Sequence, residues 1–79
     1  MDKLRAMRMF VRVVDAGSFT SVANELNVTT SMISKEIGRL EEDLGVRLLH
    51  RSTRGQQLTS IGEGYLERCR ELLVQVDDA

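Results

Sequence analysis

Apolar residues recur at intervals of three and four through the first sixteen positions of the chain. Leu4, Met7, Phe10 and Val14 form one stripe at this spacing, which predicts an amphipathic helix that buries the stripe. Gly17 is expected to end this helix, because glycine readily accepts the left-handed conformation that follows a helix. The opposite face of the helix is basic and carries Lys3, Arg5, Arg8 and Arg12.

A short second helix is predicted directly after this glycine. Ser18 is a favourable N-cap, because its hydroxyl can accept a hydrogen bond from a free N–H of the first turn. Asn27 is expected to make the following turn, since asparagine tolerates a positive φ. The helix is expected over residues 19–26, and the side chains that it would bury are Phe19, Val22, Ala23 and Leu26.

A third helix is predicted over residues 30–43, with the pair Thr29–Thr30 as its cap and Gly45 as its stop signal. The acidic run at residues 41–43 is expected to be solvated. Because this run repels phosphate, only the amino-terminal half of the helix is expected to approach a nucleic acid. The buried stripe of the helix consists of Ile33, Ile37, Leu40 and Leu44.

The pattern changes between Val46 and Leu58. Short apolar segments at residues 47–50 and 56–58 flank a polar turn that contains Gly55, which predicts a two-stranded β-hairpin. The stretch contains three arginines and no acidic residue.

A fourth helix is predicted from this hairpin to the last residue of the chain. Thr59 or Ser60 would cap it, and Ser60 with Glu63 has the spacing of a capping box. Its apolar residues alternate at spacings of three and four, as in a coiled coil about two heptads long. We therefore expect a dimer interface formed by Tyr65, Leu66, Cys69, Leu72, Leu73 and Val76.

Composition and charge narrow the class of protein. The 79 residues have room for one small domain, and a single cysteine excludes an internal disulfide. No apolar run is long enough to span a membrane or to act as a signal peptide, so a cytoplasmic location is expected. The net charge is −1, but residues 1–58 hold nine basic and seven acidic side chains, whereas residues 59–79 hold two and five. The chain therefore combines a weakly basic body with an acidic last helix.

The sequence offers no constellation typical of an enzyme. A metal site needs several ligands at fixed spacing, whereas His50 and Cys69 stand alone and apart. The fragment Gly62-Glu63-Gly64 lacks the rest of a dinucleotide-binding motif. We therefore expect a binding protein without catalytic activity, cofactor or metal.

A helix, a short turn, a second helix and a basic hairpin follow one another in the order typical of a DNA-binding helix-turn-helix protein. Away from its buried stripe, the third helix carries Ser31, Ser34, Lys35 and Gly38, with Arg39 at the edge. Small hydroxyl residues let a helix approach base edges, and a lysine can reach guanine or phosphate. Gly38 costs about 1 kcal/mol relative to alanine, which close approach of DNA or of another helix would explain. A solvated face that merely lacks bulk is the alternative.

The hairpin and the start of the second helix add further candidates. Arg54 stands beside Gly55 at the predicted tip, where an arginine suits the narrow minor groove. Arg51 is expected to contact phosphate, or else to pair with a carboxylate of the third helix. Ser18 and Thr20 begin the second helix, where free N–H groups attract phosphate, although plain capping is an alternative for both.

Three groups of residues together resemble a known family. The first is Leu4…Phe10…Val13…Gly17-Ser18-Phe19…Ala23…Leu26, the second Ser34…Ile37…Leu40-Glu41…Leu44-Gly45, and the third Leu48…Arg51…Arg54…Leu58-Thr59…Gly62. With this combination, essentially the whole chain resembles the N-terminal DNA-binding domain of LysR-type transcriptional regulators.

This resemblance implies a mainly α fold: a winged helix-turn-helix of three helices and a two-stranded wing over residues 1–58, followed by a long dimerising linker helix over residues 59–79. It implies a bacterial, cytoplasmic regulator that binds an interrupted dyad site in double-stranded DNA as a homodimer. The whole protein would be a tetramer, with a separate C-terminal domain for a small-molecule effector. By position, Arg54 would enter the minor groove, and the major groove would be read by Thr29, Thr30, Ser31, Ser34 and Lys35.

The chain also departs from the family pattern. The family usually has a small residue at Val22, Gln-Pro at Thr30–Ser31, a polar or basic residue at Glu36 and more often Phe at Leu49. Base preferences therefore do not transfer, and Glu36 could accept from a cytosine amino group or weaken phosphate binding. Two other functions stay open: a winged helix that binds another protein, and a domain that serves only for dimerisation.

Overall fold

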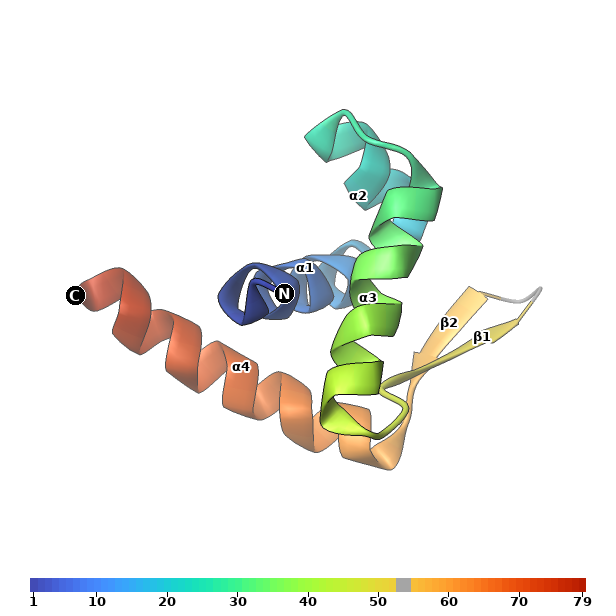
Figure 1. The fold of residues 1–79 in the computed structure, drawn as a ribbon. Coiled ribbons are helices and arrows are strands. Elements are labelled where there is room, and N and C mark those ends of the chain that lie inside the picture. Colours follow the sequence, from blue (N-terminus) through green and yellow to red (C-terminus); the bar gives the residue numbers. More distant parts are fainter. Residues whose placement is uncertain (53–54) are drawn as a thin grey trace.

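The computed structural model describes residues 1–52 and 55–79, which form four helices and one two-stranded antiparallel sheet (Figure 1). The helices are α1 (Lys3–Ala16), α2 (Phe19–Leu26), α3 (Thr30–Leu44) and α4 (Ser60–Asp78), and the strands are β1 (Leu49–Ser52) and β2 (Gly55–Leu58). This arrangement confirms the predicted winged helix with a long last helix. None of the described helices has the length and apolar character needed to cross a membrane.

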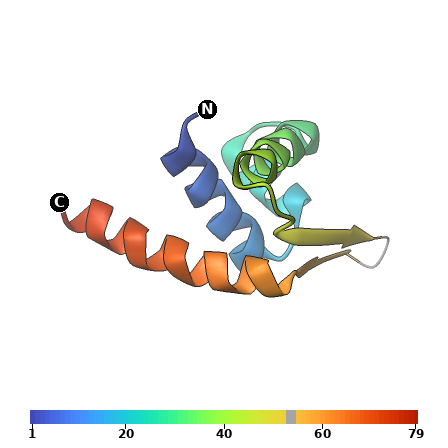
Figure 2. The ribbon, with the colours of Figure 1, turned by 60° about the horizontal axis from the view of Figure 1, so that its bottom comes forward.

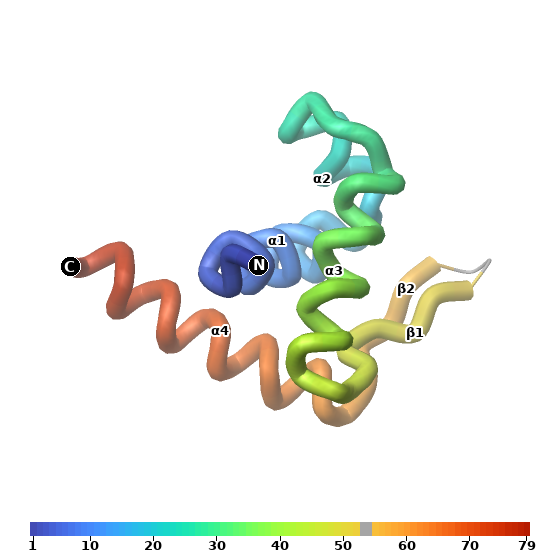
Figure 3. Tube along the Cα trace, viewed as in Figure 1, coloured from blue at the N-terminus to red at the C-terminus, as the bar shows by residue number. Residues whose placement is uncertain are grey.

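Helix α1 lies at the centre of the molecule, because it packs against α2, α3 and α4 (Figure 3). Phe10 and Val13 of α1 are fully buried with Ile37 and Leu40 of α3, and the Phe10 ring lies 5.9 Å from the Tyr65 ring of α4. The β1–β2 hairpin, here called the wing, and the free end of α4 extend from this core in opposite directions (Figure 2). One face of the molecule therefore carries α3 and the wing, while α4 projects on the other side of the core.

The predicted helix boundaries hold because local capping signals are satisfied. Gly17, Asn27 and Gly45 all follow their helices in the left-handed conformation, with φ of 76°, 57° and 72°. The Ser18 hydroxyl accepts from the Ser21 N–H, and the Thr29 hydroxyl accepts from the Met32 N–H. These caps fix a three-residue turn between α2 and α3.

The extent of the buried stripes differs from the expectation. Leu4 and Leu26, predicted to be buried, are 42% and 45% exposed. Both line an open groove between α1 and the α2–α3 pair, together with Met32. Since α2 has only eight residues, only its middle, at Val22 and Ala23, lies deep in the core.

The wing is tied to the core at its base. Its register pairs Leu49 with Leu58 and Arg51 with Gln56, which places leucines at the inner end. The Gln56 side-chain amide donates to the carbonyl of Val13 in the last turn of α1, at 2.9 Å. The predicted hairpin is therefore confirmed, and Gln56 joins its second strand to the end of α1.

The start of α4 passes very close to the segment that leads into β1. Thr59 caps α4 by accepting from the Gly62 N–H, so the cap is Thr59 and not Ser60. A Cβ placed on Gly62 would lie 2.1 Å from the Leu48 carbonyl oxygen, whereas one on Gly64 would meet nothing within 4 Å. Glycine at position 62 is therefore required by packing.

Two alanine substitutions within α4 test this close approach. We expect Gly62→Ala to lower the free energy of unfolding by about 1–3 kcal/mol, because the backbone of Leu48 must move away. Gly64→Ala should raise it by about 0.5–1 kcal/mol, since alanine is the better helix former. Urea denaturation of both variants measures the difference, and equal effects would contradict the proposed packing constraint.

Candidate nucleic-acid interface

The outward face of α3 is polar and open to solvent. Ser31, Lys35 and Arg39 are exposed along it, and Thr30 lies exposed at its amino-terminal end. A Cβ placed on Gly38 would meet nothing within 4 Å, so no packing within the described residues explains this glycine. The face thus has cations, hydroxyls and one position without a side chain, all accessible to a large ligand.

The basic face of α1 is neutralised by acidic residues of other elements. Lys3 pairs with Asp43 at 3.2 Å and Arg5 with Glu36 at 3.3 Å. The other two pairs are Arg8 with Asp77, whose pKa is lowered by hydrogen bonds from that guanidinium, and Arg12 with Glu25.

Lys35 and Arg39 on α3 have no such partner. Neither forms an ion pair or hydrogen bond with any residue of the described ranges 1–52 and 55–79. Glu36, on the same helix, turns toward α1 and pairs with Arg5. Two cations on the exposed face of α3 are therefore not neutralised by the described residues, and a polyanion can approach them.

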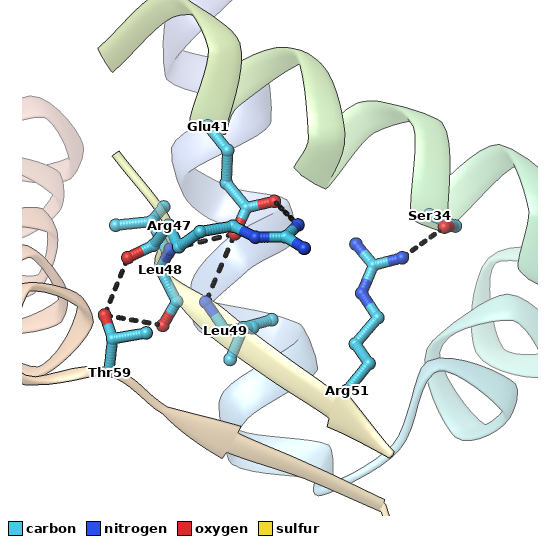
Figure 4. Close-up of polar contacts among 7 residues, drawn as sticks. All are labelled: Ser34, Glu41, Arg47, Leu48, Leu49, Arg51 and Thr59. Carbon is cyan, nitrogen blue, oxygen red and sulfur yellow. Dashed lines mark hydrogen bonds and ion pairs between the residues drawn. The ribbon is translucent and has the colours of Figure 1, made fainter. Parts of the chain in front are cut away.

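Arg51 of β1 joins the wing to both helices of the helix-turn-helix. Its guanidinium carbon lies 4.5 Å from the centre of the Phe19 ring, and its Nη1 donates to the Ser34 hydroxyl (Figure 4). The expected alternative, a carboxylate of α3 as partner, is not found among the described residues, because Ser34 takes this place. Ser34 is half-buried beneath this contact.

Glu41 contradicts the expectation that the whole acidic run is solvated. Glu41 is only 7% exposed, and its carboxylate accepts hydrogen bonds from the Leu48 and Leu49 N–H groups at 2.8 and 3.2 Å (Figure 4). Arg47 adds an ion pair at 3.7 Å. The chain reverses at Gly45 and brings these amides back to α3, so Glu41 fastens the entrance of the wing to the C-terminal end of that helix.

Thr59 extends this junction to α4. Its hydroxyl donates to the Arg47 carbonyl at 2.7 Å, and its N–H donates to the Leu48 carbonyl at 3.0 Å. Glu41 and Thr59 therefore hold opposite polar groups of the same short segment. Sequence analysis missed both roles, although the hydrophobic neighbours Leu40 and Leu44 of Glu41 are a local signal for a residue near the core.

The remaining candidates are distributed over the helix starts. Ser18 and Thr29 act as caps, which leaves Thr20 and Thr30 as exposed hydroxyls at the starts of α2 and α3. Arg54, predicted for the minor groove, lies outside the described residues. No group of three potential metal ligands is found in the part of the chain that the structure describes.

The predicted dimer seam of α4 separates into two groups. Cys69 and Leu73 are buried against the core of their own chain, and Tyr65 and Leu66 pack against it, so these residues already have a partner surface. Burial raises the pKa of Tyr65 to about 12, with a smaller contribution from the Cys69 thiol. Leu72 and Val76 remain 40% and 41% exposed.

Comparison with known proteins identifies the class. The family described as "Bacterial regulatory helix-turn-helix protein, lysR family" matches residues 4–63. An HTH-type transcriptional repressor of Pseudomonas aeruginosa is 50% identical over 78 residues, and the activator AaeR of Escherichia coli is 44% identical. Each match covers 99% of this chain and 25% of the relative, so the chain spans a quarter of the length of these curated relatives.

Solved structures agree with this assignment. The DNA-binding domain of CbnR in a complex with DNA superposes with a TM-score of 0.90 at 37% identity, over 99% of this chain and 88% of that one. The BenM domain bound to catB site 1 DNA superposes with a TM-score of 0.89 at 38% identity, and the match covers 99% of this chain and 83% of the BenM chain. The chain belongs to the LysR family, and it forms the winged helix-turn-helix DNA-binding domain of that family.

Substitution of Glu41 tests the junction between α3 and the wing. Glu41→Ala leaves two amide N–H groups without an acceptor, so we expect a loss of about 3 kcal/mol in the free energy of unfolding. Glu42→Ala, at the exposed neighbouring position, is expected to change it by less than about 0.5 kcal/mol. Thermal or urea unfolding measures both, and a stable Glu41→Ala domain would refute the structural role of this carboxylate.

Proposed function

We propose that this domain binds an interrupted dyad site in double-stranded DNA as a homodimer, with α3 in the major groove and the wing at the minor groove of each half-site. The observation that carries this proposal is the exposed face of α3, where Lys35 and Arg39 have no acidic partner within residues 1–52 and 55–79. The CbnR and BenM domains were solved in complexes with DNA, and the likeness of this chain to them supports the same activity here.

The side chains divide into two roles. Ser31, Lys35 and Thr30 lie on the exposed part of α3 that can reach base edges, where hydroxyl and ammonium groups meet base acceptors. Ser18 and Thr20 at the start of α2, with Arg39 and Arg51, are assigned to phosphates, which give affinity and orientation rather than sequence preference. Thr29, the cap of α3, stays with the residues proposed for the major groove. Ser34 and Arg54 complete the proposed contact set, Ser34 on α3 and Arg54 in the wing.

Dimerisation is assigned to the exposed flank of α4. Leu72 and Val76 are the predicted seam residues that the chain leaves open, and Ile61, 56% exposed, lies on the same flank at helical spacing. Two linked domains make the second half-site effectively intramolecular, which compensates for the few cations in one copy. We treat residues 1–58 as the DNA-binding unit and residues 59–79 as the linker helix.

The whole protein extends this proposal. Since the relatives are four times longer, we propose a C-terminal domain for a small-molecule effector and a tetrameric state in the complete regulator. The relatives are bacterial transcriptional regulators, which supports a non-enzymatic role in the cytoplasm, where the chromosome lies.

One observation favours a second function. Leu4, Leu26 and Met32 leave apolar side chains in the groove between α1 and the α2–α3 pair, a surface that suits a protein partner. A duplex titration with and without competitor DNA distinguishes this alternative from DNA binding.

Selection from a random duplex pool, followed by titration of the recovered site, tests the DNA-binding proposal. We expect a dyad sequence and an affinity that falls steeply with salt, since phosphate contacts release counterions. Lys35→Ala should weaken the selected site about tenfold and random duplex less, because a base contact discriminates between sequences. Lys3→Ala, which removes an ion-paired lysine from α1, serves as the control. Equal losses of affinity for the selected and the random duplex would mean that Lys35 contacts the phosphate backbone of DNA and not a base.

A charged residue on the flank of α4 tests the dimer. Leu72→Glu is expected to shift the sedimentation of the domain toward the monomer, because an unpaired charge would be buried at the interface. Val74→Glu places the same charge at a position that is 60% exposed and points away from this flank, so it should leave the dimer intact. Sedimentation velocity over a concentration series measures both. An unchanged Leu72→Glu dimer would place the interface elsewhere.

A further inference from the structure

Three side chains from three different elements meet where the wing approaches the helix-turn-helix. Phe19 is the first residue of α2, Ser34 lies in the first half of α3, and Arg51 is in β1. The Arg51 guanidinium carbon lies 4.5 Å from the Phe19 ring centre. Figure 4 shows the second contact, in which Arg51 Nη1 lies 2.5 Å from the Ser34 hydroxyl oxygen. The cluster therefore connects α2 and α3 to the wing, and none of its three side chains is a carboxylate.

The contacts restrict the guanidinium in two ways. The Phe19 ring attracts the cation, as expected for a cation–π contact, and the Ser34 hydroxyl binds one of its Nη groups. Arginine has five N–H donors, and one of them is used by Ser34. Arg51 as a residue is exposed, so its other donors remain available while these two contacts hold the side chain before any DNA arrives.

The same contact decides what Ser34 can do. A serine hydroxyl has one donor proton and two acceptor lone pairs, and here one lone pair already accepts from Arg51 Nη1. No acceptor for its proton is found among residues 1–52 and 55–79. The adjacent positive charge also disfavours the approach of another donor, such as the amino group of adenine or cytosine.

We propose that Phe19, Ser34 and Arg51 form one preorganised donor unit, in which Phe19 is a positioning residue and Ser34 is confined to donating. The unit binds a hydrogen-bond acceptor of DNA, which is either a phosphate oxygen or a base acceptor such as guanine N7 or O6. This inference rests on the proposed DNA binding. It adds that hydrogen bonds at this position run from the protein, as donor, to the DNA, as acceptor. It distinguishes Ser34 from Ser31, whose hydroxyl forms no hydrogen bond with an arginine of residues 1–52 and 55–79.

A double-mutant cycle on the duplex selected from the random pool tests the unit. Arg51→Lys keeps the charge but loses the planar fork, and we expect an affinity loss of about tenfold. Ser34→Ala should cost about three- to fivefold, and the double variant no more than Arg51→Lys alone, since the residues act together. Phe19→Leu keeps apolar bulk and should cost about threefold, with no further loss when it is combined with Arg51→Lys.

Arg12→Lys is the matched control, because Arg12 is ion-paired with Glu25 near the C-terminal end of α2. This substitution should change the affinity for DNA by less than about twofold. Thermal melting of each variant confirms folding. If Phe19→Leu does not fold, the double-mutant cycle of Ser34 and Arg51 still tests whether these side chains act together. If the affinity losses of Ser34→Ala and Arg51→Lys multiply in the double variant, the two residues act independently and the proposed unit is wrong. An Arg51→Lys variant with native affinity would also refute the unit. Neither result would contradict DNA binding itself. A native chain that binds no duplex would overturn the proposed function together with this inference.

Modified duplexes identify the acceptor. Single methylphosphonate substitutions remove the charge from one phosphate, and 7-deazaguanine removes one base acceptor. We expect one such change to weaken the native domain but not Ser34→Ala, which has already lost the donor. If no position shows this dependence on Ser34, the donor role of this hydroxyl is wrong.

Discussion

The buried carboxylate of Glu41 organises the side of the molecule that faces the proposed ligand. It accepts from the amides of Leu48 and Leu49 just after the chain reverses at Gly45, while Thr59 binds the carbonyls of the same segment. The end of α3, the entrance of the wing and the start of α4 are thereby held by one set of hydrogen bonds. A charge-assisted bond is stronger than a neutral one, so the junction is stiff despite its small size. The close passage of Gly62 under Leu48 completes it.

The distribution of ion pairs explains how an acidic chain can present a DNA-binding surface. The four cations of α1 are paired with acids of α2, α3 and α4, so they contribute little to the outer field. Lys35 and Arg39 of α3 form no ion pair with residues 1–52 or 55–79, and Arg51 is held by an aromatic ring and a hydroxyl, neither of which neutralises it. Net charge is therefore a poor guide to the function of this domain, whereas the pairing of each cation is informative.

Local signals were enough to predict the helices, because each cap lies within a few residues of the groups that it satisfies. The role of Glu41 could not be predicted in this way, since its partners lie seven and eight residues further on, beyond a reversal of the chain. The seam of α4 shows a different limit. Its spacing requires a covering surface but does not distinguish α1 from a second chain, and α1 covers Cys69 and Leu73. The contact between Ser34 and Arg51 spans 17 residues and has no signature in either segment.

Two exposed ion pairs brace α4 against α1: Arg8 with Asp77, and Arg70 with Asp15. Together with the buried contacts of Cys69, they hold the last half of α4 beside α1. In the dimer that we propose, the direction of α4 would determine how far apart the two copies of α3 stand. The separation of half-sites would then depend in part on residues remote from any nucleotide. Relatives could diverge in operator geometry by altering these braces alone, while the residues that contact bases stay the same.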